Sequence, residues 1–275
     1  MESNEYLYHY TNIETLALIL SNKTIRFNSL NNMDDLQEQE TADIKNIGQF
    51  FYISSWTDDS TESIPMWNMY ASLNLGIRIR LRKNPFKIYD NSVESIKETI
   101  NVPIKYSSNN ALVKTLIPFL EMFNKGFYTA QALTKDILFK VEYTDDKEKL
   151  YPHILEQQET SVSLAFGELG RYKNLHWKFQ NEWRYMLTIL PFNLTQLNTT
   201  NMLNNLSLIA SKLILGTEKQ PFPHYDMKLS EESFSEMQIT LSPRISAGNR
   251  IIVKSLIEKY NPSAELKESS LIGLI

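Results

Sequence analysis

LYHYTNIETLALIL, residues 7–20, passes from a strand pattern to a helix pattern with no loop between them. Residues 6–11 alternate in character. This alternation predicts a strand with Leu7, His9 and Thr11 on one face and three tyrosines on the other. His9 is therefore expected at the carboxyl end of a strand, beside an aliphatic side chain.

A helix is predicted directly after this strand. Residues 11–14, Thr-Asn-Ile-Glu, have the spacing of a capping box, in which the Thr11 hydroxyl accepts an amide and Glu14 reaches back to the Thr11 amide. One apolar stripe, of Ile13, Leu16, Ala17 and Leu20, gives the helix its buried face. Residues 24–27 then read as a second strand.

Alternation with a period of two recurs at residues 49–56, 76–82 and 179–190, and each stretch predicts a strand. In residues 76–82 three aliphatic side chains face one way and Arg78, Arg80 and Arg82 the other. A short helix carrying Trp67 and Tyr70 is predicted before Gly76.

Later in the chain we predict a helix at about 247–259 and an extended stretch near 264–271. Residues from about 109 to 174 are predicted to be mostly helical, with a strand at 137–146. No linker or repeat interrupts this order. We therefore predict a single α+β domain over residues 1–275, with a mixed or split β-sheet and a helical insertion at about 109–174.

Composition narrows the classes of function. The 275 residues are 42% hydrophobic, which suffices for a core, and carry a formal net charge of -4, which gives no general attraction for polyanions. The sequence lacks cysteine, so disulfides and thiolate chemistry are absent, and its four histidines are too scattered to predict a metal site. With acidic Glu2 and Glu5 at the start and no membrane-spanning stretch, we expect a cytoplasmic protein without a membrane partner.

Two ionisable residues, His9 and Glu182, form the first candidate site because both lie near predicted strand ends. The alternative is an interior histidine and a structural acid that pairs with Arg184 on the same strand face, where the guanidinium would partly neutralise the carboxylate.

Hydroxyls and aromatics at Tyr52, Ser54, Ser55 and Trp56 suit a stacking surface for a flat ring, although core packing gives the same pattern. Without a Gly-x-Ser-x-Gly elbow, serine-hydrolase chemistry is disfavoured. The arginines of residues 78–82 suit a diphosphate or an RNA backbone, and equally a solvated sheet face.

The usual cofactor signatures are missing: no Gly-x-Gly-x-x-Gly fingerprint, no phosphate loop and no His-Glu-x-x-His. An acidic cluster of Asp34, Asp35, Glu38 and Glu40 has the ligands for a divalent ion, but its spacing is not that of an EF-hand and a solvated loop explains it equally well.

Several blocks, LYHYTNIETLALILSNKTIRFNSLNNMDD, FYISSWTDDSTESIPMWNMYASLNLGIRIRL, HWKFQNEWRYML and ITLSPRIS, resemble the bacterial family called domain of unknown function 2971. The resemblance runs from about residue 6 to 271. Its motif positions are His9, Tyr10 and Thr11, then Asn32 and Asp34, then Ser54 and Ser55, then Trp67, Tyr70 and Gly76, then Glu182 and Arg184. The loop departs from the family pattern at Met33 and Leu36.

The opening block is also similar, more remotely, to the first motif of DNA-modifying ADP-ribosyltransferases and of RNA 2'-phosphotransferases. That resemblance implies a split β-sheet of the ADP-ribosyltransferase fold with a cleft for NAD as substrate. It implies that Glu182 stabilises an oxocarbenium-like ribose and that His9 holds a ribose hydroxyl. The binding residues it implies are His9, Tyr10, Thr11, Arg26, Tyr52, Ser54, Ser55, Trp67, Tyr70, Arg78 and Arg184, with Tyr52 or Tyr70 on nicotinamide and Arg78 or Arg26 on the diphosphate.

The resemblance thus implies a NAD-consuming ADP-ribosyltransferase or NAD glycohydrolase that acts as a toxin or antiphage effector. Its ligand would be a small nucleotide, and the acceptor of ADP-ribose would be a protein or a nucleic acid. One alternative is a non-catalytic module that senses a nucleotide or nucleic acid in the same cleft. A weaker alternative is a metal-dependent nuclease that uses Asp34, Asp35 and Glu38.

Overall fold

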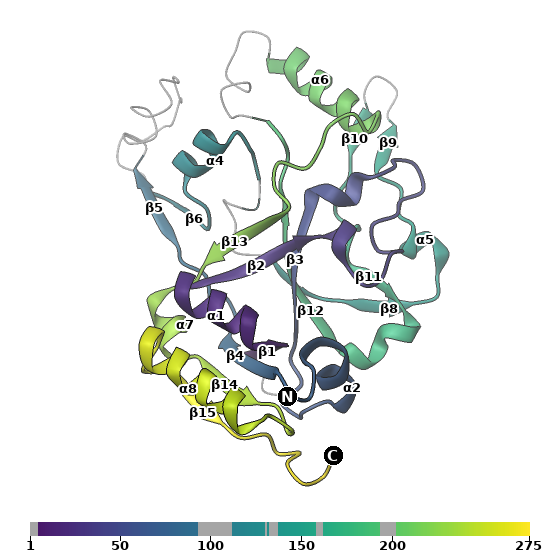
Figure 1. Ribbon diagram of the computed structural model, residues 1–275. Coiled ribbons are helices and arrows are strands. Elements are labelled where there is room, and N and C mark those ends of the chain that lie inside the picture. The colour runs from purple at the N-terminus through teal and green to yellow at the C-terminus, as the bar shows by residue number, and fades with distance from the viewer. Residues whose placement is uncertain (1–4, 93–111, 130, 132–136, 158–161, 193–201) are drawn as a thin grey trace.

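The structure is a computed structural model that describes residues 5–92, 112–129, 131, 137–157, 162–192 and 202–275. Nine strands form one mixed sheet in these residues (Figure 1). They are β1 (Tyr6–Asn12), β2 (Thr24–Ser29), β3 (Phe51–Thr57), β4 (Gly76–Arg82), β7 (Leu138–Lys140), β12 (Glu182–Thr188), β13 (His224–Lys228), β14 (Gln238–Leu241) and β15 (Glu265–Lys267). The order is β13-β2-β3-β1-β4-β14-β15, with β12 between β3 and β7, and only β14–β15 among these pairs is parallel.

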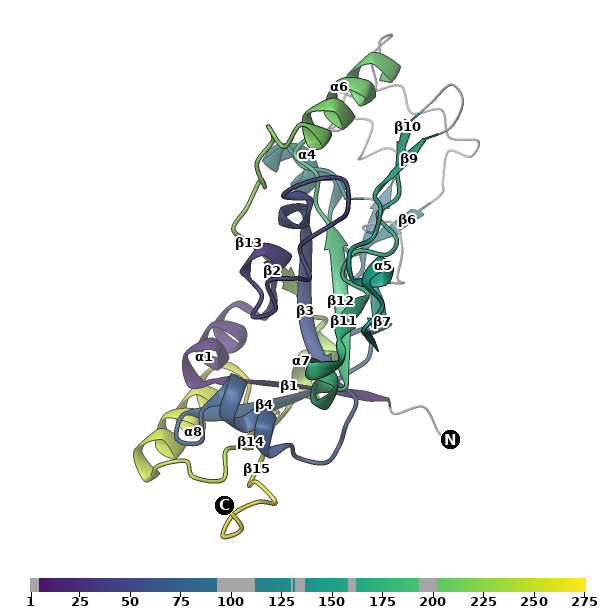
Figure 2. The same ribbon diagram turned by 90° about the vertical axis from the view of Figure 1, so that its right-hand side faces the viewer.

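The sheet is split into two arms. β1 and β3 share a single residue pair, Tyr8 with Thr57, whereas β1 pairs with β4 over its whole length. The arm of β1, β4, β14 and β15 crosses the ends of β3 and β12 (Figure 2). The coarse prediction of a mixed, split sheet is therefore confirmed.

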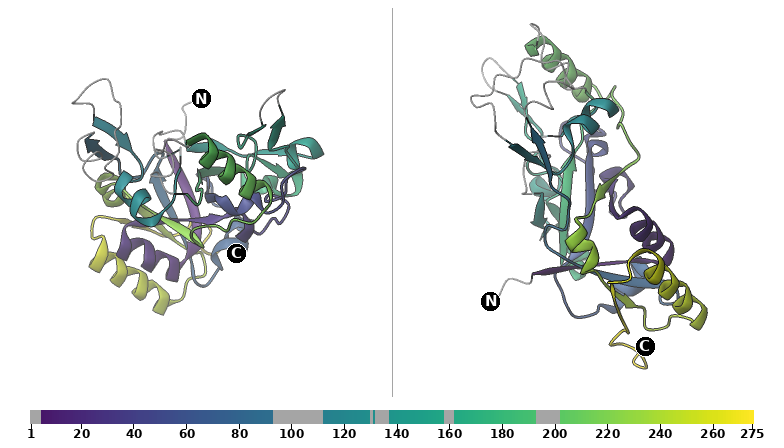
Figure 3. Two further views of the ribbon diagram at one scale, coloured as in Figure 1. Left: turned by 90° about the horizontal axis from the view of Figure 1, so that it is seen from above. Right: turned by 90° about the vertical axis from the view of Figure 1, so that its left-hand side faces the viewer.

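Two helices, α1 (Ile13–Asn22) and α8 (Ala247–Tyr260), lie side by side against one arm (Figure 3). The predicted apolar stripe of α1 faces the sheet: Leu16 and Leu20 are buried with Ile77 and Ile79 of β4 in the larger core cluster. Each such aliphatic side chain contributes about 1.5–3 kcal/mol on burial. α8 agrees with its predicted range.

Strand β3 is buried on both faces. Tyr52 and Trp56 belong to the larger core cluster, whereas Phe51 and Ile53 belong to a second cluster on the opposite face. This double burial explains why β3 reads as a nearly continuous run of apolar and aromatic residues.

The remaining helices are short, except α6. They are α2 (Ile64–Met66), which continues into one π-helical turn η3 (Trp67–Ala71), α4 (Phe119–Lys125), α5 (Lys147–Leu150), α6 (Met202–Ile214) and α7 (Glu231–Ser235). Three 3₁₀ turns are η1 (Leu30–Asn32), η2 (Ile47–Phe50) and η5 (Leu175–Gln180). No helix in the described residues has the length and apolar character needed to cross a membrane.

The predicted helical middle is wrong for the residues that the structure describes. Between residues 112 and 174 the chain forms six strands: β6 (Leu112–Thr115), which pairs with β5 (Tyr89–Ser92), then β7, β8 (Glu142–Thr144), β9 (Leu155–Gln157), β10 (Val162–Leu164) and β11 (Tyr172–Asn174). Among the described residues of this range, only α4 and α5 are α-helices. Pairing of short strands with neighbours outweighs helix propensity in this region. Residues 109–111, 130, 132–136 and 158–161 lie outside the described part.

The predicted capping box is displaced by one residue. Thr11 still pairs with Ile77 as part of β1, and Asn12 caps α1 by accepting the Thr15 amide at 2.8 Å. Asn is among the best N-cap residues, so the strand continues one residue further before the helix begins.

Candidate functional site

The candidate site lies where β1 and β2 separate along one edge of β3. β2 pairs with β3 at Tyr52 and Ile53, β1 pairs with it at Thr57, and among the described strands none pairs with residues 54–56 on that edge. On the opposite edge β12 pairs with β3 throughout, and Glu182 is the partner of Thr57. The register thus places Tyr8 of β1 and Glu182, at the start of β12, on opposite sides of Thr57.

His9 occupies part of this gap. Its Nδ1 lies 2.8 Å from the Ser55 carbonyl oxygen, which accepts a hydrogen bond and therefore fixes the proton on Nδ1. Burial lowers the pKa of His9, and the hydrogen bond to Ser55 opposes that shift only in part. The ring is consequently neutral at pH 7, with Nε2 as a hydrogen-bond acceptor.

Two adjoining cavities open at the gap. The larger has a volume of about 350 Å³ and the smaller about 90 Å³. Six residues line both of them: His9, Tyr10, Met33, Asp34, Ser55 and Tyr70. The two cavities therefore share a wall and together form one cleft.

The larger cavity is polar but offers little free positive charge. Its walls include hydroxyl and amide side chains of α1 and β2, at Thr15, Asn22, Thr24 and Asn28. Arg26 donates to both oxygens of Asp226, at 2.8 and 2.9 Å. This wall suits the hydroxyls of a sugar better than a bare phosphate.

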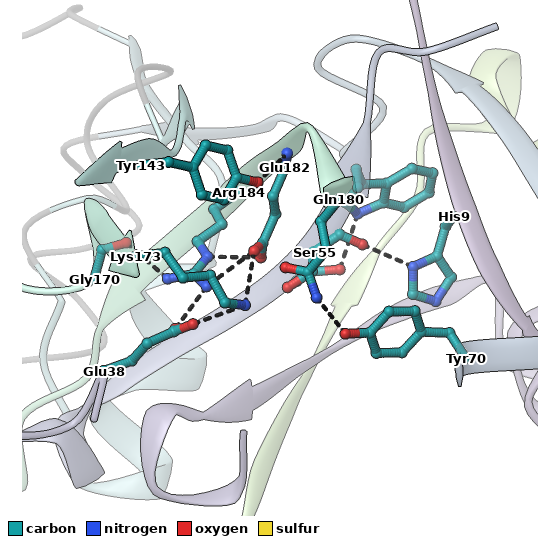
Figure 4. Close-up of polar contacts among 12 residues, drawn as sticks. His9, Glu38, Ser55, Tyr70, Tyr143, Gly170, Lys173, Gln180, Glu182 and Arg184 are labelled. Atoms are coloured by element: carbon teal, nitrogen blue, oxygen red, sulfur yellow. Dashed lines mark hydrogen bonds and ion pairs between the residues drawn. The ribbon is translucent and has the colours of Figure 1, made fainter. Parts of the chain in front are cut away.

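A cluster of four buried charges adjoins the smaller cavity, which three of its members line (Figure 4). This charge cluster consists of Glu38, Lys173, Glu182 and Arg184, each with a side chain at most 7% exposed. Lys173 Nζ lies 2.8 Å from Glu38 and 3.1 Å from Glu182. Arg184 lies 2.6 Å from Glu38 and 2.7 Å from Glu182. Two cations and two anions leave the cluster formally neutral.

The cluster keeps Glu182 ionised. Burial raises the pKa of its carboxyl, but the charges of Arg184 and Lys173 and a hydrogen bond from Ser55 outweigh it and bring the pKa to about 2. The Tyr143 hydroxyl accepts the Glu182 backbone N–H at 2.8 Å, and Arg184 also donates to the Gly170 carbonyl at 2.8 Å. Glu182 is therefore a fixed anion whose charge is compensated by its neighbours.

Gln180 and Tyr70 close the smaller cavity. Gln180 is the last residue of η5, and Asn181 after it takes a left-handed conformation with φ of 43° that leads into β12. The Gln180 side-chain N–H donates to the Tyr70 hydroxyl, whereas its Oε1 is buried with no partner among the described residues. Burial, with the charges of Asp34 and Glu182, raises the pKa of Tyr70, which stays protonated.

The structure brings most of the predicted site residues together. Those that line the two cavities are His9, Tyr10, Thr11, Arg26, Ser54, Ser55, Tyr70, Glu182 and Arg184. His9 and Glu182, far apart in the sequence, line the same smaller cavity. Glu182 also pairs with Arg184, as the structural alternative anticipated.

Three predicted residues do not line either cavity. Tyr52 lies in the core and donates to the Phe222 carbonyl at 2.6 Å, and burial raises its pKa to about 12. Trp67 is buried and donates to Glu62 at 2.9 Å. Arg78 lies 3.9 Å from the centre of the Tyr8 ring and donates to two loop carbonyls.

Sequence reasoning missed Lys173 and Gln180, and it assigned Glu38 to a different role. Glu38 belongs to the acidic stretch considered for a metal, but its carboxylate binds Lys173 and Arg184. Within the described residues no group of three or more His, Asp or Glu side chains could hold a metal ion. The only available signal for Lys173 was a lysine between polar residues, which does not distinguish it from a surface residue.

The fold and the cleft define a mixed α/β protein with a cleft lined by many polar side chains at a fork in its sheet. Residues 66–185 match the model of a family described as "Protein of unknown function (DUF2971)". The match supports the resemblance to that family and includes Trp67, Tyr70, Gly76, Glu182 and Arg184. The searches of curated proteins and of solved structures gave no match.

Proposed function

We propose that the protein is a NAD-consuming enzyme of the ADP-ribosyltransferase type, acting as a transferase or as a NAD glycohydrolase. One observation carries the proposal: His9 and Glu182 line one small cavity that adjoins a larger polar cleft. The smaller cavity would take the nicotinamide ring, and the larger would take the rest of the dinucleotide, with Arg26 on its wall as the cation for the diphosphate.

The chemistry requires a fixed negative charge near the anomeric carbon. As the glycosidic C–N bond breaks, nicotinamide leaves with the bonding electron pair and the ribose becomes oxocarbenium-like. Glu182, with a pKa of about 2, is ionised at every physiological pH. Water or an acceptor then adds to the same carbon and loses a proton, while His9 Nε2 accepts a hydrogen bond from a ribose hydroxyl.

Release of nicotinamide from NAD tests this proposal. We expect turnover by the natural protein and a loss on the order of a hundredfold in Glu182→Gln, because a preorganised charge of this kind contributes about 3–4 kcal/mol. His9→Asn, which leaves the charge cluster intact, is expected to lower turnover as well. Glu236→Gln, an exposed acid that pairs with Arg82, is the matched control. Absence of nicotinamide release by the natural protein would contradict the proposal.

The second candidate is a non-catalytic sensor of nucleotides in the same cleft. It is favoured by the compensation of Glu182, whose oxygens accept from Arg184 and Lys173 within a neutral cluster. A sensor predicts that NAD or a related nucleotide raises the melting temperature without being cleaved, because a ligand that binds only the folded state stabilises it. Stabilisation together with nicotinamide release favours the enzyme instead.

A further inference from the structure

The smaller cavity has the walls of a slot for a flat ring. Its apolar and aromatic lining consists of Tyr8, Tyr10, Met33, Trp56, Met66 and Tyr70. The cavity, about 90 Å³, is comparable in size to a single six-membered ring. Aromatic and thioether side chains stabilise such a ring through stacking and dispersion contacts.

The buried side-chain polar atom of this slot that lacks a partner among the described residues is a hydrogen-bond acceptor. Gln180 is only 4% exposed, its Nε2 is committed to the Tyr70 hydroxyl, and its Oε1 has no partner among the described residues. His9 donates through Nδ1 to Ser55, which leaves Nε2 as an acceptor. Asp34 adds a carboxylate to the lining.

The cations that line the slot are already paired with acids. Lys173 binds Glu38 and Glu182, and Arg184 binds the same two acids and the Gly170 carbonyl. An anionic ring substituent would therefore meet Gln180 Oε1 and Asp34 without a free cation to balance it. A donor on the ring would instead satisfy the buried Gln180 oxygen, whose lack of a partner is costly.

We propose that the smaller cavity selects a flat heteroaromatic ring that carries an amino or carboxamide N–H group, and that Gln180 determines this specificity by accepting a hydrogen bond from that group. The inference rests on the proposed function, because it concerns the same cleft and identifies nicotinamide as a ring of the required class. The inference adds that the cavity discriminates between two rings that differ only in carrying an amide or a carboxylate.

Nicotinamide and nicotinate are the probes, since they differ only in the amide and the carboxylate. Calorimetric titration of the full chain is expected to show nicotinamide binding at least about tenfold more tightly than nicotinate. Gln180→Leu is expected to abolish this preference. Tyr70→Phe removes the hydroxyl that Gln180 contacts and is expected to retain the preference for nicotinamide. Gln37→Leu, at an exposed position, is the matched control.

The outcomes separate this inference from the proposed function. Preference for nicotinamide that depends on Gln180 supports the inference even when NAD is not cleaved, in which case the enzyme proposal alone fails. Equal affinity for both rings, tighter binding of nicotinate, or binding of neither ring overturns the inference, whether or not NAD is cleaved. Loss of the preference in Tyr70→Phe to the same degree as in Gln180→Leu also overturns it, since Gln180 would then act only by positioning Tyr70.

Discussion

Replacing Arg184 by methionine should destabilise the protein strongly. Arg184 is 1% exposed, and its guanidinium contacts Glu38, Glu182 and the Gly170 carbonyl. The variant leaves Lys173 as the only cation beside two buried carboxylates. Breaking a buried ion pair from one side costs about 3–5 kcal/mol, because the remaining charge has lost its partner and cannot reach water.

A second substitution should restore part of that loss. Glu38→Gln alone leaves a surplus cation in the cluster, but Arg184→Met combined with Glu38→Gln leaves Lys173 paired with Glu182 and the cluster neutral again. We therefore expect the double variant to be more stable than the sum of the single effects implies, by about 1–3 kcal/mol of coupling. The coupling is the direct measure of charge balance in the cluster.

Urea unfolding followed by tryptophan fluorescence provides the assay, because the chain has 4 tryptophans. The transition midpoint should fall with little change in slope, since the substitution alters stability more than the surface exposed on unfolding. Arg82→Met is the matched control: Arg82 pairs with Glu236 at 2.7 Å on the surface, and its loss should leave the midpoint nearly unchanged.

Two results would refute the reasoning about the charge cluster. The first is an Arg184→Met variant as stable as Arg82→Met, which would mean that water reaches the cluster. The second is a double variant whose loss equals the sum of the two single losses, which would mean that the charges do not act together.

Two further predictions concern acid stability and backbone packing. The pKa of Glu182 is lowered to about 2 in the folded state, so the unfolded chain binds the proton of this carboxyl more tightly. The stability that Glu182 adds relative to Glu182→Gln should therefore be full above about pH 4.5 and disappear toward pH 2. Urea unfolding at several pH values measures this difference in stability, and a difference that does not change with pH would contradict the prediction. Gly76→Ala should lower the free energy of unfolding by about 1–3 kcal/mol, because a Cβ at this position would lie 2.4 Å from the Ser72 carbonyl oxygen. Thermal or urea unfolding measures this loss, and an unchanged midpoint would contradict the prediction.

The alternation of apolar and polar residues was sufficient to predict the strands that bury every second side chain. In β4, Ile77 and Ile79 are fully buried, whereas Arg78 and Arg80 stack on the tyrosines of β1. The aligned arginines thus form a ladder with aromatic neighbours, and Arg78 does not line the cleft. A strand paired along its whole length repeats the same environment at every second residue, so its pattern is visible in sequence.

The middle of the chain was not predictable in this way. β7 and β8 lie within the strand predicted at 137–146, but β9, β10 and β11 were not predicted. These three strands have three residues each, too few for a period to emerge, and β11 pairs with β8, which lies elsewhere in the sequence. The charge cluster has the same difficulty, because Glu38 and Lys173 come from separate loops and strands. Tertiary pairing makes these residues neighbours: β11, which carries Lys173, pairs with β8, and Lys173 contacts both Glu38 and Glu182.

The position of the cleft follows from the split in the sheet. Two strands that pair with opposite ends of the same β3 edge must separate between those ends, and the backbone groups exposed there need other partners. The His9 ring satisfies one of them, the Ser55 carbonyl, and doing so directs Nε2 away from β3 as an acceptor. A polar cleft is thus a consequence of the fork itself, and His9, in the middle of β1, satisfies one of the backbone groups that the fork exposes.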